Sequence, residues 1–263
     1  KSSIKITFTG IVAERNALKS LVPIMKFLQS NIQQARDHLA LDESMLMAAE
    51  QLHAGESLRV WEFSEQVVVA GRSSRVEEEI DTEFCQQSGT EILRRCSGGA
   101  SVVGGPGCLM YSVVLSLVKH PSLRKIDHAH QFVMSRVLKS LQEQIPQVEL
   151  QGICDVVWND RKCSGNSLRV HRNHLLYHGT LLYGFNLDFL HRCLKFAPRQ
   201  PEYRRGRDHS DFVTNIPVDP KDFNESIRRQ FDAEEKADKR IYEEIMATIR
   251  SDRYEDEAWH YRH

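Results

Sequence analysis

The sequence predicts an α/β (α+β) fold in which a mixed, largely antiparallel sheet is flanked by helices. In some segments apolar residues recur at helical spacing, and in others they form short runs typical of buried strands. These segments alternate without the regular rhythm of a doubly wound parallel sheet, which favours antiparallel pairing. No internal repeat or low-complexity linker divides the chain. We therefore expect an N-terminal extension over residues 1–35, packing on or preceding one domain over residues 36–263, with no C-terminal accessory domain.

The N-terminal half contains one clear helix and several strands. A strand-like piece at 4–8 precedes a helix at 41–52, where apolar residues lie on one face and Gly55 marks the end. Further strands are expected at 58–60, 67–69, 91–93 and 110–117, with a glycine-rich loop at 97–107.

The C-terminal half begins with a helix at 132–141 that ends before Pro146. Asn159-Asp160 then predicts a tight turn between a strand at 156–158 and a return strand from Arg161. The remaining expected elements are a strand at 175–183 and helices at 223–231 and 241–249.

Bulk composition excludes several classes of protein. The 35 basic and 36 acidic residues leave a net charge of −1, so the sequence predicts no nucleic-acid partner. The longest apolar runs, such as 113–117, are too short to cross a bilayer, so no membrane partner is expected. None of the six cysteines forms a C-x-x-C pair, which argues against a zinc ribbon and for free thiols in a reducing compartment. We expect a cytoplasmic protein, or a mitochondrial one if a targeting segment precedes Lys1.

The segment RRCSGGASVVGGPG, residues 94–107, is a candidate anion site. It holds five of the fourteen glycines, and glycine lets successive backbone N–H groups approach a ligand closely. Arg94 and Arg95 would add positive charge at its mouth, suited to a carboxylate or phosphate. A glycine-rich turn with surface arginines fits the same residues equally well.

Two further segments carry candidate polar residues. Lys162 begins a strand in DVVWNDRKCSGNSLR, and its point charge could draw a carboxylate and a phosphate together, although lysines near hairpin turns are more often solvated. The triplet 178–180, His-Gly-Thr, interrupts an apolar strand and must be hydrogen-bonded or face a cavity. A single histidine in a strand is more often a structural residue than a catalytic one. No protein metal site is predicted.

Together these segments resemble the lipoate-protein ligase and octanoyltransferase family, which shares its fold with biotin-protein ligases. The similarity lies in RRCSGGASVV followed by CLMYSVVLSL, in NDRKCSGNSLR and in HGTLL, in this order and spacing. It extends to LALDESML, RVWEFSEQVVVAGR, FVTNI and RYEDEAW, and so covers roughly 36–259. The resemblance implies the biotinyl/lipoyl protein ligase type of catalytic domain.

The resemblance also implies roles for individual residues. Lys162 matches the essential lysine, which holds the acyl carboxyl oxygen and stabilises negative charge during transfer. Loop 94–100 matches the segment that wraps the acyl chain and the adenylate phosphate. The residues that match substrate-binding positions are Arg94, Arg95, Ser97, Gly98, Gly99, Ala100, Asp155, Ser164, Gly165, Arg169, His178, Gly179 and Thr180.

The implied activity is ATP-dependent protein lipoylation, a ligase reaction. Lipoate or octanoate would form an acyl-adenylate with ATP and Mg²⁺, and the acyl group would pass to a lysine of a lipoyl-domain acceptor. Three departures touch the nucleotide end: Ala100 replaces the third glycine of SGGG, Gly104-Gly105 replaces a His-Asp pair, and Cys154 replaces an asparagine. Adenylation could therefore need a separate accessory subunit. The alternatives are an acyltransferase without ATP activation and a non-catalytic paralogue that binds the acyl-adenylate.

The cysteines and one arginine-rich segment are two further features of the sequence. Cysteine-dependent octanoyltransferases place their nucleophile elsewhere, so Cys154, Cys163 and Cys193 are expected to be buried, unreactive thiols. The arginine-rich segment 198–209 could meet an acidic acceptor or close over phosphates, or it could be a solvated loop.

Overall fold

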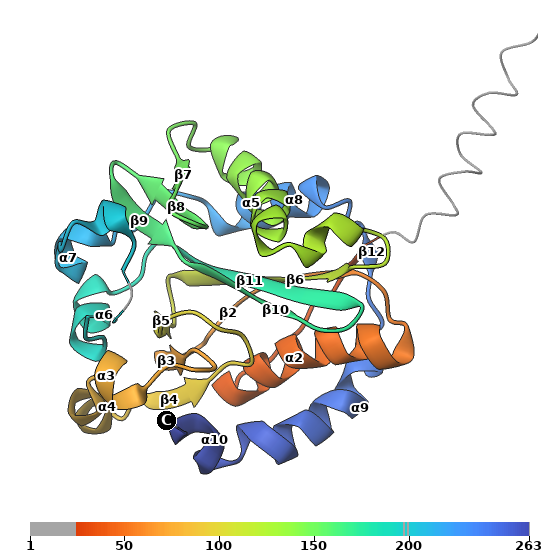
Figure 1. Cartoon of the computed structure of the whole chain (residues 1–263), viewed down its shortest axis with the longest axis horizontal. Helices are drawn as coiled ribbons and strands as arrows, with labels where there is room; N and C mark the ends of the chain where they lie inside the picture. Colours follow the sequence, from red (N-terminus) through yellow and green to blue (C-terminus); the bar gives the residue numbers. More distant parts are fainter. Residues whose placement is uncertain (1–24, 197, 199, 263) are drawn as a thin grey trace, which may run out of the picture.

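The computed structural model describes residues 25–196, 198 and 200–262 (Figure 1). The strands are β1 Lys26–Phe27, β2 Ser57–Glu62, β3 Val67–Ala70, β4 Glu91–Arg94, β5 Val102–Gly104, β6 Cys108–Ser116, β7 Glu149–Gln151, β8 Asp155–Trp158, β9 Arg161–Ser164, β10 Asn166–Val170, β11 His174–Leu182 and β12 Glu235–Lys236. The helices are α2 Ala35–Leu52, α3 Val76–Glu79, α4 Thr82–Ser88, α5 Ile126–Gln142, α6 Leu187–Cys193, α7 His209–Phe212, α8 Pro220–Gln230, α9 Arg240–Ile249 and α10 Glu257–Tyr261. Short 3₁₀ turns η1 Pro121–Arg124 and η2 Glu202–Arg204 and a π-turn η3 Arg250–Tyr254 complete them.

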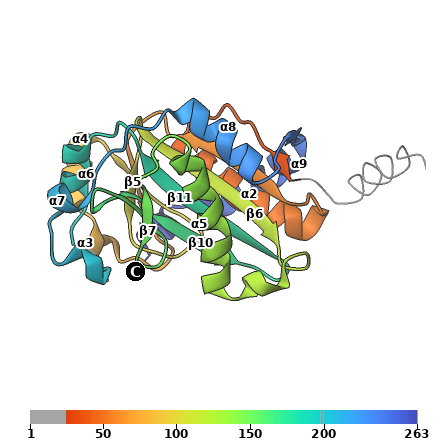
Figure 2. The ribbon, with the colours of Figure 1, turned by 90° about the horizontal axis from the view of Figure 1, so that it is seen from above.

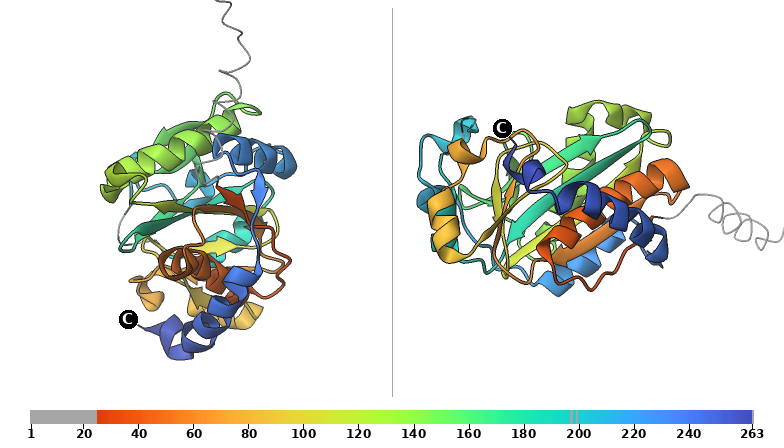
Figure 3. Two further views of the ribbon diagram at one scale, coloured as in Figure 1. Left: turned by 90° about the vertical axis from the view of Figure 1, so that its right-hand side faces the viewer. Right: turned by 90° about the horizontal axis from the view of Figure 1, so that it is seen from below.

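A six-stranded sheet forms the centre of the fold, in the order β10-β11-β6-β2-β1-β12. The pairs from β10 to β2 are antiparallel, whereas β1 runs parallel to both of its neighbours. The predicted fold class, a mixed and largely antiparallel sheet flanked by helices, is confirmed. Helices α5 and α8 cover one face, and α2 and α9 cover the other (Figures 1 and 3).

Strand β6 shows why the run at 110–117 lacks polar alternation. All nine residues of β6 are buried, because both faces of the sheet are covered. Tyr111 and Val113 pack with α5 and α8, whereas Val114 packs with α2 and α9. The view from above shows α5 crossing this sheet (Figure 2).

Two smaller sheets stand at one end of the central sheet. One has the order β4-β3-β5, and the other has the order β7-β8-β9. The predicted turn between β8 and β9 is confirmed, since Asn159 and Asp160 have φ values of 51° and 57°, the left-handed region that such turns require. A register shift at Val156/Val157 and a parallel bridge from Lys162 to Val213 fix the position of β9.

Several short elements were not anticipated. The expected loop at 97–107 contains β5, and the segments with α3, α4, α6 and α10 had no assignment. Helix α4 carries visible end signals, because Asp81 accepts a hydrogen bond from the Phe84 N–H and Gly89 closes the helix at φ 67°. Its apolar pattern is too short to show helical periodicity. The strand expected at 4–8 lies outside the described residues. No helix in the described ranges is long and apolar enough to span a membrane.

Arg94 fastens the C-terminal segment to β4. Its guanidinium is fully buried and donates to the carbonyls of Gly71 at 2.6 Å and Arg262 at 2.7 Å. Its backbone N–H donates to Nδ1 of His260, and Trp259 Nε1 donates back to its carbonyl. Because one buried side chain donates to carbonyls of two separate segments, its loss removes these hydrogen bonds together.

We therefore predict that Arg94→Met lowers the free energy of unfolding by about 2–4 kcal/mol and speeds amide exchange in α10. Urea unfolding and hydrogen-exchange mass spectrometry measure both effects. Arg75→Met is the matched control, because the Arg75 side chain forms an exposed ion pair with Glu78 and its loss should cost less than about 1 kcal/mol. Equal unfolding curves for the two variants would contradict the role of Arg94.

Candidate active site

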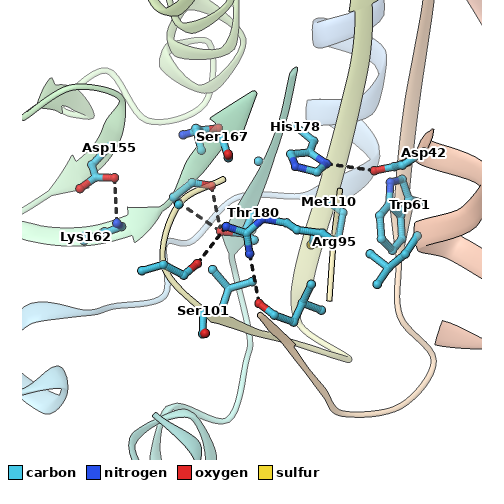
Figure 4. A pocket seen from close by; sticks show the side chains of 18 residues that line it. Asp42, Trp61, Arg95, Ser101, Met110, Asp155, Lys162, Ser167, His178 and Thr180 are labelled. Atoms are coloured by element: carbon cyan, nitrogen blue, oxygen red, sulfur yellow. Dashed lines mark hydrogen bonds and ion pairs between the residues drawn. The ribbon is translucent and has the colours of Figure 1, made fainter. Parts of the chain in front are cut away.

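A pocket opens where the central sheet meets the two smaller sheets (Figure 4). This central pocket has a volume of about 140 Å³ and combines an apolar wall with convergent polar groups. It is lined by Leu39, Asp42, Trp61, Val69, Arg95, Gly99–Val102, Met110, Asp155, Lys162, Gly165–Ser167 and His178–Thr180. Helix α2, strands β2, β6, β9 and β11 and the glycine-rich loop all contribute.

The structure gathers most of the predicted site residues around this pocket. Those that line it are Arg95, Gly99, Ala100, Asp155, Lys162, Gly165, His178, Gly179 and Thr180. Ser97 and Gly98 lie behind it in the loop, and Ser164 faces an adjoining cavity. Arg94 and Arg169 do not line it. Arg94 holds the C-terminal segment, and Arg169 pairs with Glu43 at 2.5 Å.

Of the two arginines expected at the loop mouth, Arg94 lies away from the pocket, whereas Arg95 lines it. Arg95 is buried, and its N–H groups serve the loop itself. It donates to the carbonyls of Val69 at 3.1 Å, Gly98 at 2.5 Å and Ala100 at 2.9 Å. Burial lowers the pKa of Arg95 to about 10, which leaves it charged at neutral pH. Arg95 therefore contributes to the pocket by fixing the backbone of the loop that lines it.

A buried chain of hydrogen bonds joins the loop to the sheet. Nδ1 of His178 lies 3.2 Å from Oδ2 of Asp42, and Nε2 lies 2.5 Å from Oγ of Ser97. Burial disfavours the Asp42 carboxylate, but the His178 hydrogen bond and the charge of Arg59 outweigh it and lower the pKa of Asp42. An ionised carboxylate only accepts, so Nδ1 of His178 carries the proton. Oγ of Ser97 also accepts from Nε of Arg95 at 3.1 Å, so Ser97 connects the loop arginine to His178.

Arg59 completes this network below the pocket. Its side chain is fully buried and pairs with Oδ1 of Asp42 at 2.9 Å. Nη2 lies 2.5 Å from Nδ1 of His38, which must accept because guanidinium only donates. Burial and the neighbouring Arg59 lower the pKa of His38 to about 3, so this imidazole is neutral. His38 also stacks on Trp61, with ring centroids 4.4 Å apart.

Lys162 and Asp155 form the other polar end of the pocket. Nζ of Lys162 lies 2.8 Å from Oδ1 of Asp155, and Tyr203 donates its hydroxyl to Oδ2 at 2.7 Å. Gly165 leaves room for the lysine, because a Cβ at that position would lie 3.3 Å from Nζ. Thr180 accepts a hydrogen bond from the Gly165 N–H at 3.2 Å. The ion pair with Asp155 thus fixes the position of the Lys162 side chain, 28% of whose surface is still exposed.

Two cavities adjoin the central pocket. The side cavity, of about 150 Å³, lies beyond Lys162 and has an apolar wall with the buried Arg204. The outer cleft, of about 700 Å³, opens to solvent and is lined by Ala100, Gly152–Asp155 and Gln200–Tyr203. Arg199, which was expected to add charge to this segment, lies outside the described residues.

The expectation that Cys154, Cys163 and Cys193 are buried is confirmed. All six cysteines are buried and free, and none lines the central pocket. Burial raises the pKa of Cys96, Cys108 and Cys163 to about 12 and that of Cys154 to about 11. The described residues include no group of three or more His, Cys, Asp or Glu side chains that could hold a metal ion.

Several residues of the central pocket and the outer cleft were not expected from the sequence, among them Asp42, Trp61, Ser167 and Tyr203. A signal for Asp42 was available, since Asp42-Glu43 interrupts an otherwise apolar stretch of helix. A charged pair in such a stretch needs partners from elsewhere in the fold. Ser167 donates to the Gly98 carbonyl at 2.8 Å, a contact across 69 residues that no local pattern indicates.

The sequence matches the family model of the lipoyl protein ligase A/B catalytic domain over residues 34–232. Lipoate--protein ligase 1 of Staphylococcus aureus is 25% identical over 90% of this chain and 73% of its own length. Lipoate-protein ligase LplJ of Bacillus subtilis is 26% identical, over 71% of this chain and 54% of its own length. Octanoyltransferase LipM of Carboxydothermus hydrogenoformans is also 26% identical, over 64% of this chain and 68% of its own length.

Solved structures with the same fold include two ligases. A bi-partite lipoate protein ligase from Thermoplasma acidophilum superposes with a TM-score of 0.75 at 20% identity, covering 90% of this chain and 96% of that one. A lipoate-protein ligase A bound with ATP superposes with a TM-score of 0.74 at 22% identity, covering 91% of this chain and 99% of that one. At this identity the likeness concerns the fold.

The buried ion pair yields a stability prediction. We expect Asp42→Asn to lower the free energy of unfolding by about 3–5 kcal/mol, because Arg59 then has no counter-charge. The folded-state pKa of Asp42 is lowered, so its contribution is present above the unfolded pKa and lost as pH falls through the folded value. Urea unfolding at neutral pH and below about pH 4 should show the difference shrinking in acid. A difference that grew in acid, or one no larger than that of the exposed control Glu78→Gln, would contradict the network.

Proposed function

The chain belongs to the lipoyl protein ligase A/B catalytic-domain family, and on that premise we propose that it attaches lipoate or octanoate to a protein lysine through an acyl-adenylate. Its family of enzymes comprises lipoate-protein ligases and octanoyltransferases. The observation that carries the ligase proposal is Lys162, held by Asp155 at the junction of an apolar pocket and a side cavity. Residues 36–263 would form the catalytic unit, preceded by 1–35.

In the first proposed step, the acyl carboxylate attacks the α-phosphate of ATP. A carbon-bound oxygen forms a bond to phosphorus, and pyrophosphate leaves with the electron pair of the broken P–O bond. Lys162 would neutralise charge on the carboxylate and phosphate oxygens. Mg²⁺ would arrive with the nucleotide as part of the substrate, since the described residues supply no metal cluster.

In the second step, the acceptor amine attacks the acyl carbon. An amide bond forms, the bond from the acyl carbon to the adenylate oxygen breaks, and AMP leaves. The acceptor lysine starts as an ammonium group and releases two protons to solvent, one before the attack and one as the amide forms. Lys162 would stabilise the oxyanion that develops on the acyl oxygen. The apolar wall of Leu39, Trp61 and Met110 would hold the acyl chain.

The match to an octanoyltransferase favours a second candidate, transfer of an acyl group without ATP. A cysteine thioester is one route for such transfer, but the thiols here are buried and five of the six have a raised pKa. A non-catalytic binder has no evident need for a charge-stabilising lysine that is exposed to the pocket. Both alternatives remain outcomes of the assay below.

The central test uses a lipoyl domain as acceptor and mass spectrometry as readout. With synthetic lipoyl-adenylate, we expect one lipoyl group on the acceptor lysine. The bi-partite ligase with the same fold motivates a second expectation, that pyrophosphate release from ATP and lipoate is slow until an accessory protein is added. Fast release by the chain alone would contradict the need for a partner. An octanoyl group trapped on a cysteine would favour the transferase, and no reaction under any condition would favour the binder.

Substitution of Lys162 is the most direct test of the proposed mechanism. We expect Lys162→Ala to reduce transfer from lipoyl-adenylate by roughly 10²-fold or more, because a preorganised charge is lost from the transition state. Lys162→Arg should also be slow, since a planar fork does not replace a compact ammonium. Lys139→Ala, an exposed change on α5, is the control, and melting temperatures verify that all three variants fold. Transfer by Lys162→Ala at the control rate would overturn the mechanism.

A further inference from the structure

The outer cleft shares residues with the central pocket at the reacting position. Ala100 and Asp155 line both spaces, and Asp155 holds Lys162 at 2.8 Å. A group that enters the cleft from solvent therefore arrives beside Lys162 without passing through the space assigned to the acyl chain. Two segments form its walls: the turn between β7 and β8, and the chain around η2.

The lining of the outer cleft combines two acidic side chains with apolar ones. Asp155 lies at the inner end, where its residue is 9% exposed, and the exposed Glu202 stands on η2. Ile153 and Pro201 supply apolar surface along the walls. A lysine side chain has the complementary form, because it carries an ammonium on an apolar four-carbon stem.

Ile153 adds a second, independent observation. Its side chain is 79% exposed, and Leu150 in the neighbouring strand β7 is 39% exposed. A single exposed apolar residue is ordinary, but Ile153 in the wall of the cleft and Leu150 three residues before it form a surface that a partner can cover. Gly152 sits between them with φ 61°, and a Cβ there would lie 3.3 Å from the Tyr203 ring. The turn is thus packed against the same tyrosine that bonds Asp155.

The other spaces are poorly suited to an ammonium group. The side cavity contains Arg204, which is only 4% exposed and whose Nη2 atom has no hydrogen-bond partner among the described residues. A buried guanidinium repels a second cation. The far end of the central pocket is closed by the Asp42–Arg59 pair, both of whose side chains are buried.

We propose that the outer cleft admits the lysine of the acceptor protein, with Ile153 against the acceptor surface, Glu202 attracting the ammonium and Asp155 receiving it beside the acyl carbon. This inference rests on the proposed function and deepens it, since it assigns the acceptor a surface on this chain. Glu202 and Ile153 would set acceptor binding, whereas the acyl chain and Lys162 set the chemistry.

The test compares two nucleophiles on the same acyl donor. Wild type and the variants Ile153→Arg, Glu202→Lys and Glu202→Gln are given synthetic lipoyl-adenylate with either a lipoyl domain or hydroxylamine, which needs no docking surface. We expect each variant to raise the KM for the lipoyl domain, by about tenfold for the two cationic changes, and to lower the ratio of domain to hydroxylamine transfer by a similar factor. Val118→Arg and Glu235→Arg, exposed changes on other elements, are matched controls.

Three results would count against the inference, and they are distinguishable. If wild type transfers to neither nucleophile, the proposed function fails and the acceptor site fails with it. If wild type is active and the cleft variants keep the wild-type KM and ratio, the acceptor lies elsewhere and only this inference falls. If a cleft variant slows transfer to both nucleophiles equally, the cleft residues act on the acyl site rather than on docking, which also overturns it.

Discussion

The carboxylate of Asp42 is the constraint on which the site depends. It is buried in the middle of α2, and it bonds Arg59 on β2, Ser112 on β6 and His178 on β11. A buried charge is tolerated only when such partners are present, so the helix, three strands and the Ser97 loop must be in place together. The pocket is therefore a product of the assembled fold, because no single segment carries enough of these partners to form it.

Glu43, the next residue on α2, connects the same helix to the C-terminal segment. Successive residues on a helix point about 100° apart, so Glu43 faces away from the pocket. It bonds Arg169 on β10, Arg253 and the hydroxyl of Tyr254. Together with Arg94, which anchors α10 at the base of the glycine-rich loop, these contacts make the C-terminal segment part of the support of the site.

The elements predicted from sequence are those with strong periodicity or turn chemistry. The helix at 41–52, the buried strand at 110–117 and the Asn159-Asp160 turn each carry their signal within a few residues, and each is present. Partners far apart along the chain carry no such signal. Arg94 is the clearest case, since a loop arginine beside glycines suggests an anion site, yet it binds carbonyls up to 168 residues away. The sequence shows charge, whereas tertiary packing decides where that charge is used.

The departures of the loop from its family pattern have a physical account in its backbone. Gly99 adopts φ 84° and keeps its glycine, whereas Ala100 is not among the residues with positive φ, so a methyl group is accepted there without strain. Ala100 lies where the central pocket, side cavity and outer cleft meet, and its carbonyl accepts from Arg95. At Gly104 a Cβ would lie 2.5 Å from the Phe63 ring, so a larger residue cannot occupy this path of the chain. Gly104 therefore follows from packing against Phe63, whereas Gly105 has φ 150° and a Cβ there would lie 3.1 Å from Gln66. The pair by itself does not argue that the site has lost its chemistry.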